Sequence, residues 1–202
     1  EGSDLCITPV SAPENHYVRI KADNRLDADG TLRGTFTLTA EGQSDSNIRR
    51  IFTTGFQSEW KSTMERQLLA ISPKARLLSV DYGKNPKDYQ AAPIKITFRY
   101  EIPDYALRGE GEMFFRPMVM NNLYNQVRSY MWIDTSVENR KYGFKDGCSR
   151  LVELDETIQL PAGYKLVSAA KDETMQGVGA DFEGSLVQKG NKVLLHNRLA
   201  LK

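Results

Sequence analysis

Apolar and polar residues alternate with a period of two over much of this chain. The pattern is clearest from Ile94 to Ile102, where every second residue is apolar and the residues between are polar. The same alternation runs through His16–Ala22 and Thr31–Glu41, and threonines fill most of the polar side of the second segment. Because successive side chains of a strand point to opposite faces, this period predicts half-buried strands of a mostly antiparallel sheet.

Shorter runs of alternation predict further strands along the rest of the chain. They are Arg76–Tyr82, Gly111–Arg116, Ser129–Asp134, Arg150–Leu160, Tyr164–Ser168, Asp181–Gln188 and Lys192–Leu201. Turn residues separate several of these runs, as in Pro161-Ala162-Gly163 and Lys189-Gly190-Asn191. The last quarter of the chain is therefore expected to form a meander of strands.

One segment, residues 46–71, has the spacing of a helix instead. Its apolar residues recur at intervals of three and four: Ile48, Ile51, Phe52, Phe56, Trp60, Met64, Leu68 and Ile71. This spacing predicts a helical element with one apolar side, which we expect to pack on a face of the sheet. Ser44, Asp45 or Ser46 is the expected N-terminal cap, and Gly55 is expected to divide the segment into two helices.

Together these patterns predict an α+β fold that is mostly antiparallel β, with a β-sandwich-like body and one helical element. A length of 202 residues suits one large domain, so we expect residues 13–202 to form a single β-rich domain. Residues 1–12 are expected to be a linker from a missing upstream domain. The chain begins at Glu1 with no initiator Met and no signal-peptide pattern, which indicates a fragment of a longer protein.

Charge and hydropathy exclude two classes of partner. Lys and Arg number 27 and Asp and Glu 26, and no long run of one sign occurs. A nucleic acid or an anionic membrane surface is therefore not an expected partner. No stretch of about 18 apolar residues occurs, so we expect no transmembrane segment.

Cys148 precedes a predicted strand and raises the question of a thiol enzyme. Such an enzyme needs a base, usually histidine, to form the thiolate, and thiolates activated by a helix dipole lie at a helix N-terminus. The two histidines, His16 and His196, are far apart in sequence, and a strand rather than a helix is expected after Cys148. We therefore predict no catalytic residue. A Cys6–Cys148 disulfide remains open.

Other site chemistries have little support in the sequence, so no metal and no cofactor is predicted. The scattered His and Cys residues match no zinc spacing. The stretch from Asp27 to Gly30 resembles the start of a calcium loop but lacks the later ligands, and a turn is expected there. No phosphate-binding loop occurs. A pair of carboxylates for glycoside cleavage stays open.

Loops and exposed tyrosines are the candidate binding elements. The loops Tyr82–Pro93 and Pro117–Arg128 are long enough to carry a binding function. Four tyrosines could stack on sugars or peptides: Tyr17, Tyr105, Tyr124 and Tyr130.

Five stretches of the chain are distinctive as extended phrases. They are TLRGTFTLTAEGQSDSNIRRIF (Thr31–Phe52), SEWKSTMERQLL (Ser58–Leu69), VDYG (Val80–Gly83), ITFRYEIPDYA (Ile96–Ala106) and CSRLVELDETIQLPAGYK (Cys148–Lys165). Together they resemble the C-terminal domain of exported transglutaminase-like proteins from Bacteroides-type bacteria, a domain that is itself of unknown function. The resemblance extends from about Pro9 to Leu201.

The resemblance implies a catalytic core upstream rather than one within this chain. In such proteins a cysteine-protease-like core carries Cys, His and Asp in that order. After Cys148 the one histidine is His196, and no acidic residue follows it, so no catalytic residue is carried over. The resemblance also implies an intact protein that is exported to the periplasm or the outer surface.

Three hypotheses of function follow. The first is a non-catalytic accessory domain that packs on or positions the transglutaminase-like core and helps to select its substrate. The second is a stand-alone β-sandwich module that binds a glycan or a peptide. The third is an enzyme that uses Cys148.

Overall fold

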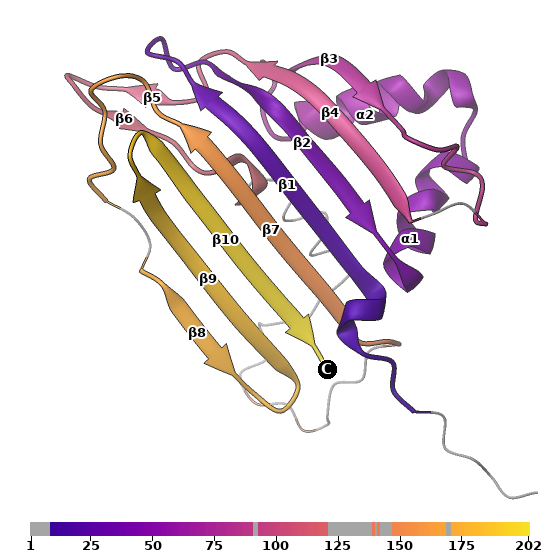
Figure 1. Cartoon of the computed structure of the whole chain (residues 1–202). Coiled ribbons are helices and arrows are strands. Elements are labelled where there is room, and N and C mark those ends of the chain that lie inside the picture. Colours follow the sequence, from indigo (N-terminus) through magenta and orange to yellow (C-terminus); the bar gives the residue numbers. More distant parts are fainter. Residues whose placement is uncertain (1–8, 91–92, 121–138, 140, 142–146, 169–170) are drawn as a thin grey trace, which may run out of the picture.

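The computed structural model describes residues 9–90, 93–120, 139, 141, 147–168 and 171–202, and these build one large twisted sheet (Figure 1). The sheet has eight strands in the order β3-β4-β2-β1-β7-β10-β9-β8. Its strands are β1 (Tyr17–Leu26), β2 (Leu32–Ala40), β3 (Arg76–Asp81), β4 (Ile94–Ile102), β7 (Arg150–Gln159), β8 (Glu173–Gln176), β9 (Ala180–Lys189) and β10 (Lys192–Leu201). A separate two-stranded ribbon consists of β5 (Leu107–Arg108) and β6 (Met113–Phe114).

The sheet is antiparallel except at its centre. There β1 and β7 run parallel, with Tyr17 opposite Leu151 and Arg25 opposite Gln159. All the other strand pairs are antiparallel. The parallel pair joins the first half of the chain to the meander β7–β10, so that both halves contribute strands to one sheet.

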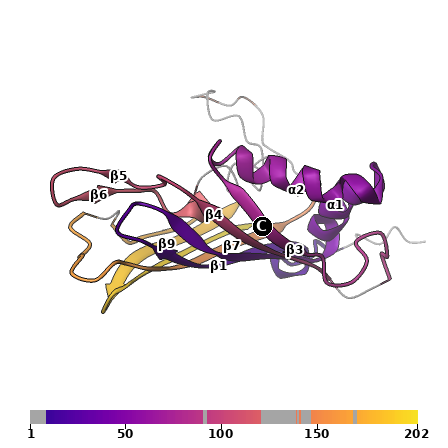
Figure 2. The ribbon, with the colours of Figure 1, turned by 90° about the horizontal axis from the view of Figure 1, so that it is seen from above.

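Helices cover one face of the sheet at the end formed by β2, β3 and β4, as Figure 2 shows. They are α1 (Gly42–Thr53), the short 3-10 turn η2 (Gln57–Glu59) and α2 (Trp60–Leu69). A further 3-10 turn, η1 (Pro13–His16), leads into β1, and η3 (Met118–Met120) follows the ribbon. The predicted helical element on a sheet face is confirmed, and the break between its two helices surrounds Gly55.

The fold class predicted from the alternation, α+β and mostly antiparallel, is confirmed. The expected sandwich-like body takes a different form, because the long strands of the described residues lie in one sheet whose inner face packs on helices. The segment Tyr164–Ser168, expected to be a strand, forms no ladder, whereas β8 was not expected. The strand expected at Ser129–Asp134 lies outside the described residues.

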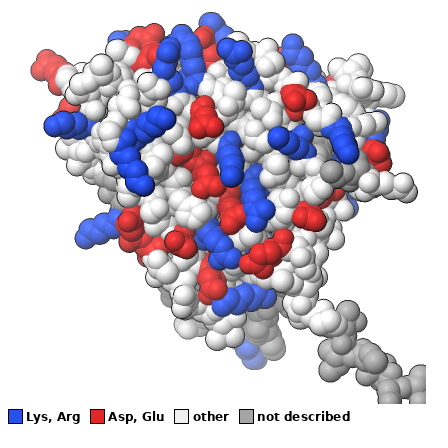
Figure 3. Space-filling model, viewed as in Figure 1, with Lys and Arg blue, Asp and Glu red and all other residues white. Residues whose placement is uncertain are grey.

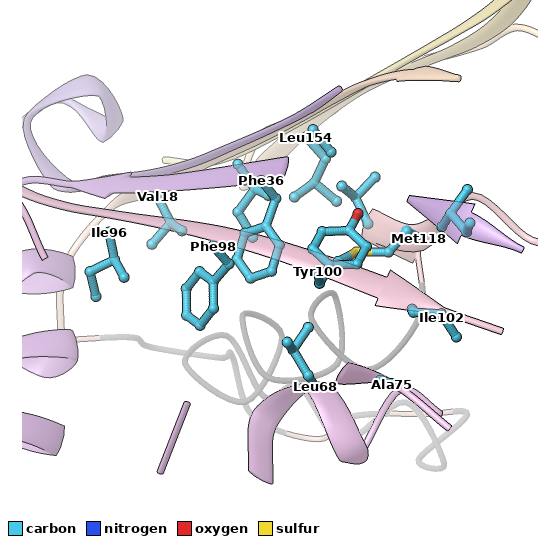
Figure 4. Close-up of a cluster of buried hydrophobic side chains, with 14 of the residues drawn as sticks. Val18, Phe36, Leu68, Ala75, Ile96, Phe98, Tyr100, Ile102, Met118 and Leu154 are labelled. Atoms are coloured by element: carbon cyan, nitrogen blue, oxygen red, sulfur yellow. The ribbon is translucent and has the colours of Figure 1, made fainter. Parts of the chain in front are cut away.

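The core lies between the inner face of the sheet and the helices. Phe36 of β2 stacks on Phe98 of β4 with ring centroids 4.2 Å apart, and Tyr100 lies 5.8 Å from Phe36. Leu68 of α2 points toward these rings, and Met118 of η3 lies beside Tyr100 (Figure 4). Phe36, Phe98 and Tyr100 occupy inward positions of the alternation in β2 and β4, as the period of two predicts.

The outer face of the sheet carries charges of both signs over its whole extent (Figure 3). Several of them form cross-strand pairs, including Arg19–Glu153, Arg33–Glu101 and Arg198–Glu153. Such pairs place opposite charges next to each other on this face.

Candidate functional site

Cys148 lies two residues before β7 and is half-buried. A strand follows it, as the sequence predicts, so among the described residues no helix begins at Cys148. The next residue, Ser149, is buried and donates a hydrogen bond from its hydroxyl to the backbone oxygen of Ser11. Cys6 lies outside the described residues, so the possible Cys6–Cys148 disulfide stays a hypothesis.

His16 caps a helix rather than activating a thiol. Its Nδ1 accepts a hydrogen bond of 3.1 Å from the backbone N–H of Gln43, in the first turn of α1. Its backbone oxygen accepts a hydrogen bond of 2.9 Å from the hydroxyl of Ser44. The cap expected from Ser44, Asp45 or Ser46 is therefore wrong, because His16, which lies 27 positions before Gln43 and 28 before Ser44, holds the first turn of α1.

His196 lies far from Cys148 along the sheet. The register places Arg150, at the start of β7, opposite Leu201, and Asp155 opposite His196. Five residues of β7, about 17 Å, therefore separate His196 from the end of the strand that follows Cys148. No hydrogen bond joins Cys148 to either histidine among the described residues. The structure therefore assembles no thiol–imidazole pair there.

A histidine, an acid and a serine do lie in one row on the outer face. His196 Nδ1 is 2.7 Å from Asp155 Oδ1 of β7, and Ser185 of β9 is opposite His196 on its other side. These residues are far apart in the sequence and meet only through strand pairing. Asp155 and His196 are about two-fifths exposed on the outer sheet face, and neither lines the groove that the described residues form at the inner face.

The two acids of the Asp27–Gly30 stretch hold a turn, as predicted. Asp29 Oδ1 accepts a hydrogen bond of 2.9 Å from the N–H of Thr31, and Asp27 pairs with Arg25 and Arg33. Gly30 has φ +82°, a conformation that suits glycine. Among the described residues no group of three or more metal-ligating side chains is close enough to hold an ion.

The loop between β3 and β4, one of the two expected binding loops, is held against α1 over much of its described length. The guanidinium of Arg49, itself buried, donates to the backbone oxygens of Pro86 and Asp88 at 3.0 and 2.8 Å. Asp45 pairs with Arg49 at 2.6 Å and also accepts from the N–H of Ile94. The other expected loop, Pro117–Arg128, is described only as far as Met120, and Tyr124 and Tyr130 lie outside the described residues.

A buried polar network crosses the inner face of the sheet. The Tyr100 hydroxyl donates to Asn24 Oδ1 at 2.5 Å, and Asn24 Nδ2 donates to Glu156 Oε1 at 2.6 Å. Glu156 Oε2 accepts from the N–H of Val119 at 3.1 Å. Gly34 lies between Asn24 and Tyr100 in the sheet, and a Cβ there would lie 2.0 Å from Asn24 Oδ1. Because Gly34 has no side chain, Asn24 and Tyr100 can form their hydrogen bond across β2.

This network fixes η3 to the sheet. Burial raises the pKa of the Glu156 carboxyl, while hydrogen bonds from Val119, Asn24 and Met118 act in the opposite direction. Burial also raises the pKa of the Tyr100 hydroxyl well above its ordinary value. Glu156 is enclosed by protein, so we interpret it as an internal anchor and not as a catalytic acid.

The ribbon β5–β6 lies at the end of the sheet away from α1 and α2 (Figure 1), and an apolar groove of about 730 Å³ is lined by residues of β6 and of the sheet. One wall is formed by residues 111–115 and 117, from the ribbon and the chain after it, and the other by residues 160–168, which follow β7. Leu26, Leu186 and Val193 contribute side chains from the sheet. The volume is typical of sites that hold small ligands or short peptide segments. The period-two alternation of the sequence marks segments of both walls, Gly111–Arg116 and Tyr164–Ser168, although it predicts both as strands of the sheet.

The rim of the groove exposes large apolar side chains. Phe114 is 60% exposed and Val167 is 90% exposed, while Phe115 and Leu166 are partly buried against the core. The charged side chains that line it are Glu112 on the ribbon wall and Lys165 on the facing wall. Apolar area with few charges suits a polypeptide better than a sugar, which requires many polar partners.

Comparison with known proteins locates a family in the second half of the chain. Residues 111–202 match DUF3858, a domain of unknown function. The match spans both walls of the groove and strands β7–β10, whereas β1–β4 and the helices lie outside it. No curated protein and no solved structure matches the chain. The expectation of a domain of unknown function is thereby confirmed for this region, and the comparison adds no chemistry to it.

Proposed function

We propose that this chain is a non-catalytic accessory domain that holds a neighbouring polypeptide at its apolar groove. The observation that carries the proposal is the contrast between the groove and the candidate reactive groups. The groove is open and apolar, whereas Cys148 and His196 are held at different levels of the sheet. Packing contacts require apolar surface, and catalysis requires a nucleophile and a base within hydrogen-bond reach.

The neighbouring polypeptide in this proposal is a transglutaminase-like core upstream in the same protein. The five sequence stretches that resemble exported transglutaminase-like proteins support it. We also propose that residues 1–12 link that core to one domain, residues 13–202, and that the protein is exported to the periplasm or outer surface. The β1–β7 pair, which joins both halves of the chain in one sheet, supports the single domain. Among the described residues no helix has the length and hydrophobicity needed to cross a membrane.

Two measurements test the proposal. The isolated chain should show no thiol-dependent amide hydrolysis or transfer, and an activity that disappears in Cys148→Ala would overturn the non-catalytic role. The transglutaminase-like core, added in trans, should bind the chain, and Phe114→Ser together with Val167→Ser should weaken that binding. Equal binding by the wild type and the double variant would remove the groove from the contact. Fractionation of cells that carry the full protein checks the export.

A stand-alone peptide-binding module is the second candidate, and the same groove favours it. The two candidates differ in what occupies the groove. If short free peptides bind the chain and the core does not, the stand-alone function is correct. Both candidates place the contact on the same residues, so the groove variants serve both tests.

A further inference from the structure

The two walls of the groove are chain segments whose side chains alternate like those of strands. On one wall Met113 and Phe115 are partly buried, whereas Phe114 is exposed. On the other wall Tyr164 and Leu166 are partly buried, whereas Val167 is exposed. This alternation is typical of an extended chain that lies on an apolar surface.

The wall Tyr164–Ser168 has few backbone partners within the described structure. The N–H of Tyr164 closes the turn to Pro161, and the N–H of Leu166 donates to the Gln188 side chain on β9 at 2.7 Å. The backbone groups of Lys165 and Val167 have no partner among the described residues. In an extended chain, successive N–H groups point to opposite sides, so those of Lys165 and Val167 face away from Gln188.

The facing wall has a free edge of its own. The ribbon contains two strands, so β6 pairs with β5 through Phe114–Leu107 and Met113–Arg108 and with no other described strand. Half of the backbone groups of a strand in such a ladder point away from its partner. The groove is thus bordered by two extended segments, each with unused donors and acceptors.

The geometry points to an added strand. We propose that an extended peptide segment of a partner polypeptide lies in the groove between β6 and residues 164–168 and pairs with both through its backbone. The inference deepens the proposed function, on which it rests for the groove as a binding site, and it names the binding mode and the partner chemistry. An extended peptide can supply donors and acceptors to two neighbouring edges at once, and strand addition of this kind is a general mode of peptide recognition.

The charges of the groove define the partner further. Glu112 and Lys165 are of opposite sign and line facing walls, with apolar side chains between them. A complementary segment has apolar residues at alternate positions toward the floor, a basic residue near Glu112 and an acidic residue near Lys165. The uncharged floor excludes a strongly charged segment.

A library of acetylated pentapeptide amides tests the proposal. The first and last residues are Lys and Glu in either order, the second and fourth are varied among Val, Ile, Leu, Phe and Tyr, and the middle residue is Thr. Binding to the full chain is measured by fluorescence polarisation. We expect the tightest peptides to lose affinity about tenfold or more when single backbone amides are N-methylated, because each methyl removes a donor. Unchanged affinity after every N-methylation would overturn the strand mode while leaving the groove as a binding site.

Variants of the chain provide the matching test. Val167→Pro removes a backbone N–H that has no partner among the described residues and should reduce peptide affinity about tenfold, whereas Val167→Ala should change it less than about threefold. Exchange of the charges, Glu112→Lys with Lys165→Glu, should reverse the preferred order of Lys and Glu in the peptide. Urea unfolding confirms that each variant remains folded.

The outcomes separate this inference from the proposed function. If no peptide of the library binds, the added-strand mode is overturned, and binding of the transglutaminase-like core then decides the accessory role by itself. If peptides bind equally to wild type and Val167→Pro, the peptide does not pair with residues 164–168. If glycans bind and peptides do not, both the mode and the partner class are wrong.

Discussion

The two ends of the inner sheet face are covered in different ways. At the β2–β4 end, α1 and α2 lie on the sheet, and the rings of Phe52, Trp60 and Tyr82 meet edge to face with centroids 5.2 to 5.7 Å apart. At the other end the ribbon β5–β6, seen away from the helices in Figure 2, and residues 160–168 line the groove. Trp60 is 6% exposed, and Phe114 is 60% exposed.

This difference shows how the length of a covering element decides whether an apolar surface is closed. The two helices together supply an apolar side that covers the sheet. The indole N–H of Trp60 donates a hydrogen bond of 3.2 Å to the backbone oxygen of Phe52. The ribbon has strands of two residues each, too short to cover the face or to pair with the facing wall. Closed packing contributes stability at the first end, and the open apolar surface at the second end is where we propose binding.

The largest expected effect is at the closed end. Trp60→Ala should lower the free energy of unfolding by about 3–5 kcal/mol, because it removes a buried ring and leaves a cavity beside Phe52. Urea denaturation measures the change. Phe56→Ala is the control, since that ring is 77% exposed, and its effect should stay within about 0.5 kcal/mol. Equal effects of the two substitutions would contradict the closed packing.

Gly34→Ala tests the network that lies between the two ends. The new methyl group would lie 2.3 Å from the backbone oxygen of Asp23 as well as against Asn24, so we expect a loss of about 2–3 kcal/mol. Gly179→Ala has open space around the new Cβ and should change stability by less than about 0.5 kcal/mol. Thermal or urea unfolding compares them. A neutral Gly34→Ala would mean that Asn24 can leave its bond with Tyr100 without cost.

The pH dependence of stability reports on the Glu156 anchor. Its pKa is raised in the folded protein, so its contribution to stability is full below the unfolded pKa and is lost as pH rises through the folded pKa. Stability should thus fall as pH rises between those two values. Glu156→Gln should abolish this component of the slope and change the free energy of unfolding at neutral pH by about 1 kcal/mol.

Urea unfolding over a series of pH values measures that slope. Glu183→Gln, a substitution on the exposed side of β9, should leave it as in the wild type. If the slope of Glu156→Gln matches the wild type, the raised pKa does not govern the pH dependence, and the anchor is not the group that titrates.

A smaller effect is expected at the start of α1. His16→Ala removes the acceptor of the Gln43 N–H and should cost about 1 kcal/mol, the usual range for a lost helix cap. His196→Ala removes an exposed pair with Asp155 and should cost about 0.5 kcal/mol or less. The order of the two losses in urea unfolding is the result to check, and a larger loss at His196 would argue that the row on the outer face has a structural role.

The smallest effect is expected at the groove. Phe114→Ser should change the free energy of unfolding by less than about 0.5 kcal/mol, because most of the ring is already in contact with water. The same substitution should reduce binding of a partner at the groove. A loss of stability similar to that of Trp60→Ala would mean that the ribbon belongs to the closed core.

Much of the sheet could be predicted from local alternation. The predicted bounds of β4 and β10 match the structure, because both strands are half-buried along their whole length and the pattern is strong. The segment Tyr164–Ser168 also alternates between partly buried and exposed residues at its start, and it is still not a strand, because a strand also needs a partner edge. The site was less predictable, since the groove arises where segments about fifty residues apart face each other.

One further signal was present in the sequence. Asn24 and Glu156 occupy inward positions of the alternation in β1 and β7, where apolar residues are expected. A polar residue at such a position requires a buried partner, so the pair could have been proposed in advance. The space that Gly34 leaves between Asn24 and Tyr100 could not have been proposed in advance, because it depends on β2 lying between β1 and β4.

The sequence by itself determined the strand-rich fold class, the apolar side of the helical segment and the lack of a long run of one charge. These follow from neighbours a few residues apart, whose spacing sets which face of a strand or helix is buried. Tertiary structure alone decided the cap of α1 by His16, the separation of Cys148 from His196 and the groove between the ribbon and residues 160–168. Those features depend on strand order and register, which bring distant residues together or hold them apart.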